Sequence, residues 1–100
     1  MTTWKNADPS DLKRLAAIST MLDGHPKLIT FLFHPSKPEL NDAPKTLQTR
    51  ARAFSSGERV LINVGLDLWS DSGDTKVLDL FTLDSECLRR AITALIALKR

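Results

Sequence analysis

The sequence has few of the residues that mark several common kinds of protein site. Its 100 residues include one cysteine, Cys87, so no internal disulfide can form, whereas secreted domains of this size often carry several. The four glycines lie far apart and form neither the G-x-G-x-x-G nor the Walker pattern of phosphate-binding loops. These absences favour a protein of the reducing cytoplasm without a nucleotide site of either type.

Long apolar runs and strong net charge are also missing. The block densest in apolar residues, 28–33, is much shorter than the ~20 residues of a membrane helix. The polar start, residues 1–9, lacks the apolar run of a secretory signal. A net charge of +2 is too small to indicate a polyanionic partner by itself. We expect one globular domain over residues 1–100, located in the cytoplasm and without a membrane segment.

The fold class depends on how residues 58–70 are read. A strand would place large apolar and polar side chains together on its exposed face, namely Leu61, Asn63, Gly65, Asp67 and Trp69. A helix gathers the polar side chains on one narrow stripe, formed by Arg59, Asn63, Asp67 and Ser70. We therefore predict an all-α bundle of five or six short helices around a buried central helix, 58–71. The alternative is an α+β fold with a hairpin of 59–69 and 76–82.

Local signals mark the ends of this central helix. Ser55 and Glu58 have the S-x-x-E spacing of a capping box, in which each side chain accepts a free backbone N–H of the first turn. Gly73 can supply the left-handed residue that ends the helix. Gly65 lies in mid-helix, where glycine costs about 1 kcal/mol relative to alanine. We attribute it to the close approach of another helix.

Proline and capping residues divide the rest of the chain into further short helices. Helix starts are indicated near three prolines, Pro9, Pro26 and Pro44. Residues 27–34 predict a short buried helix, with a strand as the alternative, and 77–81 give either a helical turn or two or a short strand. The last helix opens at Asp84 or Ser85 and runs to the end of the sequence.

The last helix has an unusually wide apolar face. At 100° per residue its apolar side chains cover roughly 200°, compared with the ~100° stripe of an ordinary surface helix. One neighbouring helix cannot cover so wide a face. Either several elements of the domain surround it, or part of it contacts another chain. The candidate protein interface consists of Leu88, Ala91, Ile92, Leu95 and Leu98.

The distribution of charge supports binding to another protein. Residues 67–86 contain six acidic residues and only one basic residue, Lys76, whereas residues 87–100 contain four basic residues and no acidic one. Adjacent zones of opposite charge suit charge-complementary docking. The first functional hypothesis is a small non-enzymatic helical protein of adaptor, accessory or inhibitor type. It binds another protein or a second copy of itself.

A second hypothesis is weak, sequence-independent binding of nucleic acid. The helix expected after Pro44 places polar and basic side chains opposite its apolar seam, with Arg59 nearby, so the candidate face is Lys45, Gln48, Thr49, Arg52 and Arg59. Such a face can follow phosphates without reading base sequence. Aromatic residues for stacking on single strands are missing there, because the chain has no tyrosine and Phe54 falls on the apolar side.

Signals for catalysis or a bound metal are weak. Ser10 and Lys13 have the S-x-x-K spacing of penicillin-interacting enzymes, but the companion S-D-N and K-T-G elements are missing. His25, His34 and Cys87 lack the paired spacing, such as C-x-x-C, with which compact zinc sites are built. We therefore expect no enzymatic activity, no cofactor and no metal.

Overall fold

The computed structural model describes Trp4 and residues 7–98, and all the named elements in that part of the chain are helices. In chain order the elements are α1 (Pro9–Met21), α2 (Pro26–Leu32), α3 (Pro44–Arg50), the 3₁₀ helix η1 (Ala51–Ala53), α4 (Ser56–Ser70), the 3₁₀ helix η2 (Val77–Thr82) and α5 (Ser85–Ala97). Strand-like pairing within the described residues is limited to one antiparallel bridge between Phe33 and Leu40. The all-α prediction is confirmed.

Helix α4 is the central helix that the sequence predicted. The Ser55 hydroxyl accepts the Glu58 N–H at 3.3 Å, and the Glu58 carboxylate accepts the Ser55 N–H at 3.1 Å, so the capping box is confirmed. Its fully buried side is formed by Leu61, Ile62, Val64, Gly65 and Leu66. The alternative hairpin of 59–69 and 76–82 is wrong, since the first segment is α-helical and most of the second is η2.

The end of α4 differs from the prediction. Asp71, and not Gly73, takes the left-handed conformation, with φ 54° and ψ 40°. Its N–H donates to the carbonyl oxygen of Asp67 at 3.0 Å. Aspartate enters this conformation more readily than most residues because its short polar side chain forms local hydrogen bonds. Gly73 is therefore not the residue that ends the helix.

Gly65 has the role that the sequence indicated. A β-carbon at this position would lie 3.2 Å from Cδ1 of Leu32 and 3.7 Å from Cγ2 of Ile18. Leu32 belongs to α2 and Ile18 to α1. Glycine thus lets two helices pack closely against the middle of α4, as predicted.

Three aromatic side chains connect segments that are distant in the sequence. Trp4, Phe33 and Trp69 form a cluster of edge-to-face pairs, with ring centroids 5.2 to 5.7 Å apart. The indole N–H of Trp4 also donates to the carbonyl oxygen of His34 at 2.8 Å. Pairs of this geometry contribute about 0.5–1.5 kcal/mol beyond their area burial. The cluster fixes Trp4 and the end of α2 against the end of α4.

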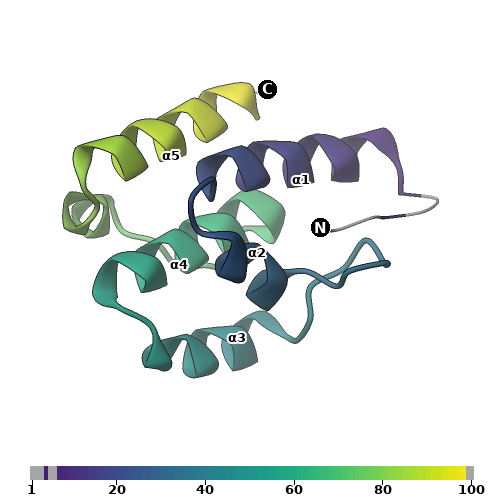
Figure 1. Cartoon of the computed structure of the whole chain (residues 1–100), viewed down its shortest axis with the longest axis horizontal. Helices are drawn as coiled ribbons and strands as arrows, with labels where there is room; N and C mark the ends of the chain where they lie inside the picture. Colours follow the sequence, from purple (N-terminus) through teal and green to yellow (C-terminus); the bar gives the residue numbers. More distant parts are fainter. Residues whose placement is uncertain (1–3, 5–6, 99–100) are drawn as a thin grey trace.

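Helix α5 lies at the edge of the bundle. In Figure 1, α4 occupies the middle, α3 lies below it, and α1 and α5 lie above it, with α5 at the top. Helix α5 runs antiparallel to α1, packs mainly against it and touches α4 more lightly. Cys87, Ala91 and Ala94 form its buried side. The opposite side of α5 therefore faces away from these two neighbours.

Candidate protein interface

Helix η2 presents large apolar side chains to the surface. Val77, Leu78 and Phe81 are 76%, 74% and 74% exposed, whereas Leu80 packs partly against the core. The Lys76 N–H donates to the Asp79 carboxylate at 2.9 Å, and this hydrogen bond caps the first turn of the helix. Residues three apart lie above one another on a 3₁₀ helix, so Leu78 and Phe81 share one edge.

The structure separates the predicted α5 interface into three environments. Ala91 is completely buried among residues of its own chain, on the side of α5 that packs inward. Leu88 and Leu98 are half-buried. Ile92 and Leu95 are 45% and 46% exposed. The prediction included Ala91 because the whole apolar arc was considered together, whereas α1 and α4 cover one part of that arc.

Ile96 belongs to the same surface, although the predicted interface residues did not include it. Its side chain is 68% exposed, more than that of Ile92 or Leu95. On a helical wheel it lies beyond Ile92, on the side away from Ala91 and Ala94. The apolar arc predicted from the sequence included Ile96, but the sequence alone does not show which edge of that arc stays exposed. We call Leu88, Ile92, Leu95 and Ile96 the α5 stripe.

Acidic residues are frequent in and around η2 in the sequence. Asp71, Asp74, Asp84 and Glu86 are exposed, Asp79 is half-buried, and the only basic residue among 71–86 is Lys76. The Asp84 side chain caps α5 by accepting the Cys87 N–H at 2.8 Å, and this hydrogen bond lowers the pKa of Asp84. Glu86 pairs with Arg89 and Arg90, so the negative charge near η2 along the chain comes mainly from the four aspartates.

The predicted basic face divides into exposed cations and an internal amide. The side chains of Lys45, Arg52 and Arg59 are exposed, and none of them forms an ion pair with the described residues. Gln48 is half-buried, and its side-chain amide donates to the Asn63 side chain at 3.3 Å and to the Gly73 carbonyl oxygen at 2.9 Å. Gln48 therefore connects α3 to α4 and to the segment after α4, and only part of its side chain stays exposed.

The rest of this basic region is neutral or partly neutralised. Thr49 is exposed, and its hydroxyl donates to the Lys45 carbonyl oxygen at 3.0 Å. Arg50 pairs with Asp42 at 2.9 Å, and Lys27 pairs with Glu58 at the same distance. Each pair places an acidic side chain next to a cation. These two pairs involve cations outside the predicted basic face, whose own cations, Lys45, Arg52 and Arg59, have no ion-pair partner among the described residues.

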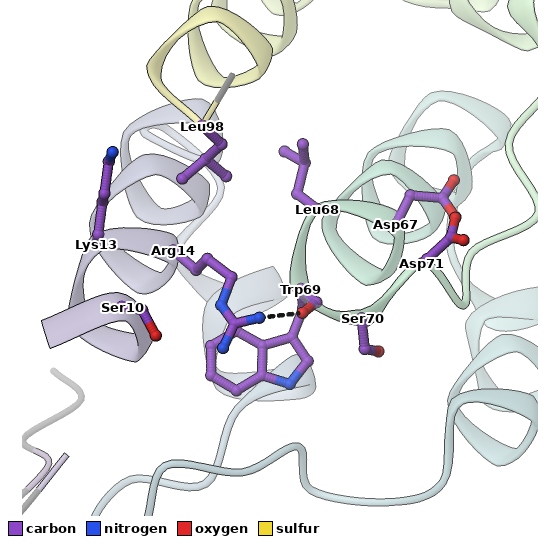
Figure 2. A pocket seen from close by; sticks show the side chains of 9 residues that line it. All are labelled: Ser10, Lys13, Arg14, Asp67, Leu68, Trp69, Ser70, Asp71 and Leu98. Carbon is purple, nitrogen blue, oxygen red and sulfur yellow. Dashed lines mark hydrogen bonds between the residues drawn. The ribbon is translucent and has the colours of Figure 1, made fainter. Parts of the chain in front are cut away.

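A cleft of about 460 Å³ opens where α1 begins and where α4 and α5 end. It is lined by Ser10, Lys13, Arg14, Asp67, Leu68, Trp69, Ser70, Asp71 and Leu98. Figure 2 shows the Arg14 guanidinium next to the Trp69 ring, at 4.9 Å from its centroid. The same guanidinium donates to the Trp69 carbonyl oxygen at 3.1 Å and pairs with Asp11.

Most polar groups of this cleft are already used by the fold. The Ser10 hydroxyl donates to the Asp8 carboxylate at 2.8 Å, and the Asp67 carboxylate accepts three backbone N–H groups of residues 73–75. In Figure 2 the Lys13 side chain points away from Arg14. Binding sites for small molecules have several polar groups that converge on the ligand. This cleft has no such set, and the S-x-x-K pair has no activated serine.

Cys87 lies beside His25 but is not an activated thiol. Their Sγ and Nε2 atoms are 3.7 Å apart. Burial, together with the neighbouring Asp84, raises the pKa of Cys87, which disfavours the nucleophilic thiolate. His34 is used elsewhere, since its Nδ1 accepts the N–H groups of Ser36 and Lys37. The described residues contain no group of three or more side chains suited to hold a metal ion.

Comparison with known proteins adds no assignment. No protein-family model, no curated protein and no solved structure matches this chain. Among residues 4 and 7–98, no helix has the combined length and apolar content needed to cross a lipid bilayer. The functional argument therefore depends on the surfaces of the molecule alone.

Proposed function

We propose that this chain is a non-enzymatic binding protein of adaptor, accessory or inhibitor type, which recognises another protein through η2 and α5. One observation carries the proposal. Six of the seven large apolar side chains that are exposed in the described structure lie between Val77 and Ile96, and the seventh is Leu12 on α1. Isolated exposed apolar residues are common on soluble proteins, but concentrated ones mark interaction sites.

This concentration of exposed apolar side chains is informative because the fold does not require apolar residues at these positions. Helix η2 has six residues, and three of them are large, apolar and about three-quarters exposed. The same helix directs Leu80 toward the core, and Leu83 directly after it is buried. A chain selected only for folding has no need for three further apolar residues here, whereas a partner that covers them gains hydrophobic stabilisation.

The charged residues near η2 indicate the kind of surface expected on the partner. Fully desolvated apolar side chains supply most of the affinity of a protein interface, and rim charges guide the encounter. The aspartates in and next to η2 in the sequence favour a partner surface with an apolar depression bordered by lysine or arginine side chains. Raising the salt concentration is then expected to slow association more than it speeds dissociation.

Site-specific photo-crosslinking in the native host tests the proposal. A photoreactive phenylalanine analogue replaces Phe81 in one variant and Ile96 in another, so the probe sits on the proposed interface. A third variant carries the same probe at Lys37, an exposed residue of the connection between α2 and α3. Discrete protein adducts at positions 81 and 96, but not at 37, are the expected result. Equal labelling at all three positions, or none, contradicts the proposal.

A second candidate function is weak binding of nucleic acid through Lys45, Arg52 and Arg59. The three exposed cations without ion-pair partners among the described residues favour it. Binding of this kind weakens steeply with salt, because contacts to phosphates release counterions. The double variant Lys45→Glu and Arg52→Glu is then expected to abolish binding to a labelled duplex at low salt. Unchanged binding by this variant removes the candidate.

A further inference from the structure

The part of the chain that contains η2 carries negative charge that the fold does not pair with cations. Residues 71–84 include four aspartates and one lysine, hence a net charge of −3, in a chain whose total is +2. None of these four aspartates forms an ion pair with a described residue. The acidic members of the ion pairs in the described structure lie elsewhere, at Asp11, Asp42, Glu58 and Glu86. We call residues 71–84 the η2 segment.

Three of its aspartates are close to the exposed apolar side chains of η2. Asp79 follows Leu78 directly on the helix. Asp74 and Asp84 are each three residues from the nearest end of the exposed apolar group, 77–81. Three residues of chain span at most about 11 Å, which is close to the Debye length of about 10 Å at 0.1 M salt. These charges therefore act on any surface that covers the apolar group.

The hydrogen bonds of these carboxylates leave their charge in place. The Asp79 carboxylate accepts the Lys76 N–H at 2.9 Å, and the Asp84 carboxylate accepts the Cys87 N–H at 2.8 Å. Both donors are neutral backbone groups, so no cation cancels the negative charge. The side chain of Asp74 is exposed. The segment thus combines exposed apolar side chains with three nearby negative charges.

This charge discriminates between possible occupants of the apolar surface. An anionic membrane surface or a nucleic acid would bring further negative charge against the aspartates. A second copy bound through the same segment would place equivalent patches face to face, as in any twofold contact, and like charges would again oppose each other. A cationic protein surface has the complementary charge.

We propose that the η2 segment selects its partner protein by the positive charge around an apolar depression on the partner's surface. Leu78 and Phe81 enter that depression. Asp74, Asp79 and Asp84 interact with lysine or arginine side chains at its border. This inference rests on the proposed function and deepens it, because the apolar pair holds the complex together while the aspartates speed its formation with a cationic partner. The α5 stripe is not needed for this selection.

The apolar pair is well supported for this role. Leu78 and Phe81 share one edge of the 3₁₀ helix and are separated by about 6 Å along its axis, so one depression can take both side chains. Behind them, Leu80 packs partly against the core and Leu83 is buried. The helix is therefore already fixed in the free chain, and binding requires little further ordering of it.

Photo-crosslinking in the native host with charge variants tests this inference. The photoreactive phenylalanine analogue occupies position 81, and Asp74→Asn, Asp79→Asn and Asp84→Asn are introduced together. Asparagine keeps the size of the side chain and an oxygen that accepts the N–H groups of Lys76 and Cys87. It also accepts the positive φ of position 74, which is 60°. We therefore expect this triple variant to have the circular dichroism spectrum of the unmodified chain.

The matched control changes the net charge by the same amount outside the η2 segment. It carries the same probe with Asp8→Asn, Asp23→Asn and Glu39→Gln, at three exposed acidic positions. The adduct from position 81 is expected to fall about tenfold or more in the η2-segment variant and to persist in the control. Equal adducts from both variants overturn the inference. Equal loss from both also overturns it, since total charge is then responsible.

A single substitution keeps the test decisive if the triple variant does not fold. Asp74→Asn alone removes one exposed charge at a position that caps no helix. Its adduct is expected to fall in the same direction by a smaller factor, and an unchanged adduct overturns the inference. Sedimentation with phosphatidylcholine vesicles is a further check, in which the unmodified chain is expected to stay in solution. Vesicle binding that Phe81→Ser abolishes assigns η2 to a lipid surface and overturns the cationic protein as its partner.

Kinetics with the purified adduct protein separate the two tasks. The η2-segment variant, without the probe, is expected to associate about tenfold more slowly or less readily still, with a weaker dependence on salt. Leu78→Ser is expected to increase the dissociation rate and leave association nearly unchanged. A triple variant that alters only dissociation overturns the role of the aspartates in association.

Failure of this inference is distinct from failure of the proposed function. Discrete adducts from position 81 that persist in the η2-segment variant retain the binding function and remove only the selection by charge. Adducts from position 96 alone assign the interface to α5 and overturn the role of η2. The absence of adducts at both positions contradicts the proposed function, and this inference with it.

Discussion

A β-carbon added to Gly73 would lie 1.8 Å from the carbonyl oxygen of Asn63. Real Cβ atoms essentially never approach other heavy atoms within 3.0 Å. The atom in the way belongs to the backbone of α4, so a flexible side chain cannot relieve the contact by moving. Gly73 is thus required by the close passage of the 71–76 segment over the side of the central helix, and not by its backbone conformation.

Gly73→Ala is expected to destabilise the protein by about 2 kcal/mol or more, because either the segment or α4 has to shift. The measurement is urea denaturation followed by circular dichroism. Gly57→Ala is the matched control, since a β-carbon there has no heavy atom within 4 Å and alanine is a better helix former. We expect that variant to be unchanged or up to about 1 kcal/mol more stable. Equal effects of the two substitutions contradict the argument.

Asp67, one turn after Asn63 on α4, holds the same segment by hydrogen bonds. Its carboxylate accepts the N–H groups of Gly73, Asp74 and Thr75 at 2.7, 3.1 and 2.9 Å. Asp67→Ala is expected to cost about 2–3 kcal/mol, because it removes three hydrogen bonds to a charged acceptor. Amide hydrogen exchange at residues 73–75 is expected to accelerate in this variant. Asp71→Asn serves as the control, since asparagine also accepts the left-handed conformation and no such change is expected.

Local sequence signals were sufficient for the central helix. The polar stripe extends over about three helical turns and the spacing of Ser55 and Glu58 over one, so α4 and its start could be predicted without tertiary information. The end of α4 was not. Gly73 has the residue type of a helix terminator, but a contact with the helix itself requires glycine there, and Asp71 takes the left-handed conformation.

The candidate surfaces were less predictable than the helices. Gln48 lies on the polar side of α3 in a helical wheel, yet the structure places it against Asn63 of α4, a partner that sequence spacing cannot reveal. Residues 77–81 are too few for a periodicity, and their exposure depends on how η2 lies on its neighbours. Trp4 lies in a polar segment, but its ring completes a cluster with two distant aromatic residues.

The apolar residues of η2 are expected to contribute little to folding. Phe81→Ser is predicted to change the free energy of unfolding by less than about 0.5 kcal/mol, because the side chain is 74% exposed. Leu83→Ala, directly after η2, is expected to cost about 2–3 kcal/mol, since Leu83 is 8% exposed. Thermal unfolding of both variants checks this contrast. A large loss of stability in Phe81→Ser reassigns η2 to the core and removes its role as a binding surface.

Glu58 makes the stability of the fold depend on pH. Lys27 lies 2.9 Å from its carboxylate, which also accepts the Ser55 N–H. The hydrogen bond from Lys27 and that from the Ser55 backbone lower the pKa of Glu58 from 4.5 to about 2. A lowered pKa means that the folded state binds this proton less readily than the unfolded state. The stabilisation is therefore complete above pH 4.5 and is lost as the pH falls toward 2.

Glu58→Gln is expected to remove this part of the acid sensitivity. The variant keeps an oxygen that can accept the Ser55 N–H but has no titratable group, so its melting temperature is predicted to fall less steeply between pH 4.5 and 2. Asp8 and Asp84 also have lowered pKa values through the hydrogen bonds of their helix caps, and both contribute equally to the two proteins. The difference between the melting curves thus isolates Glu58. Parallel curves over this range contradict the assignment of this part of the acid sensitivity to Glu58.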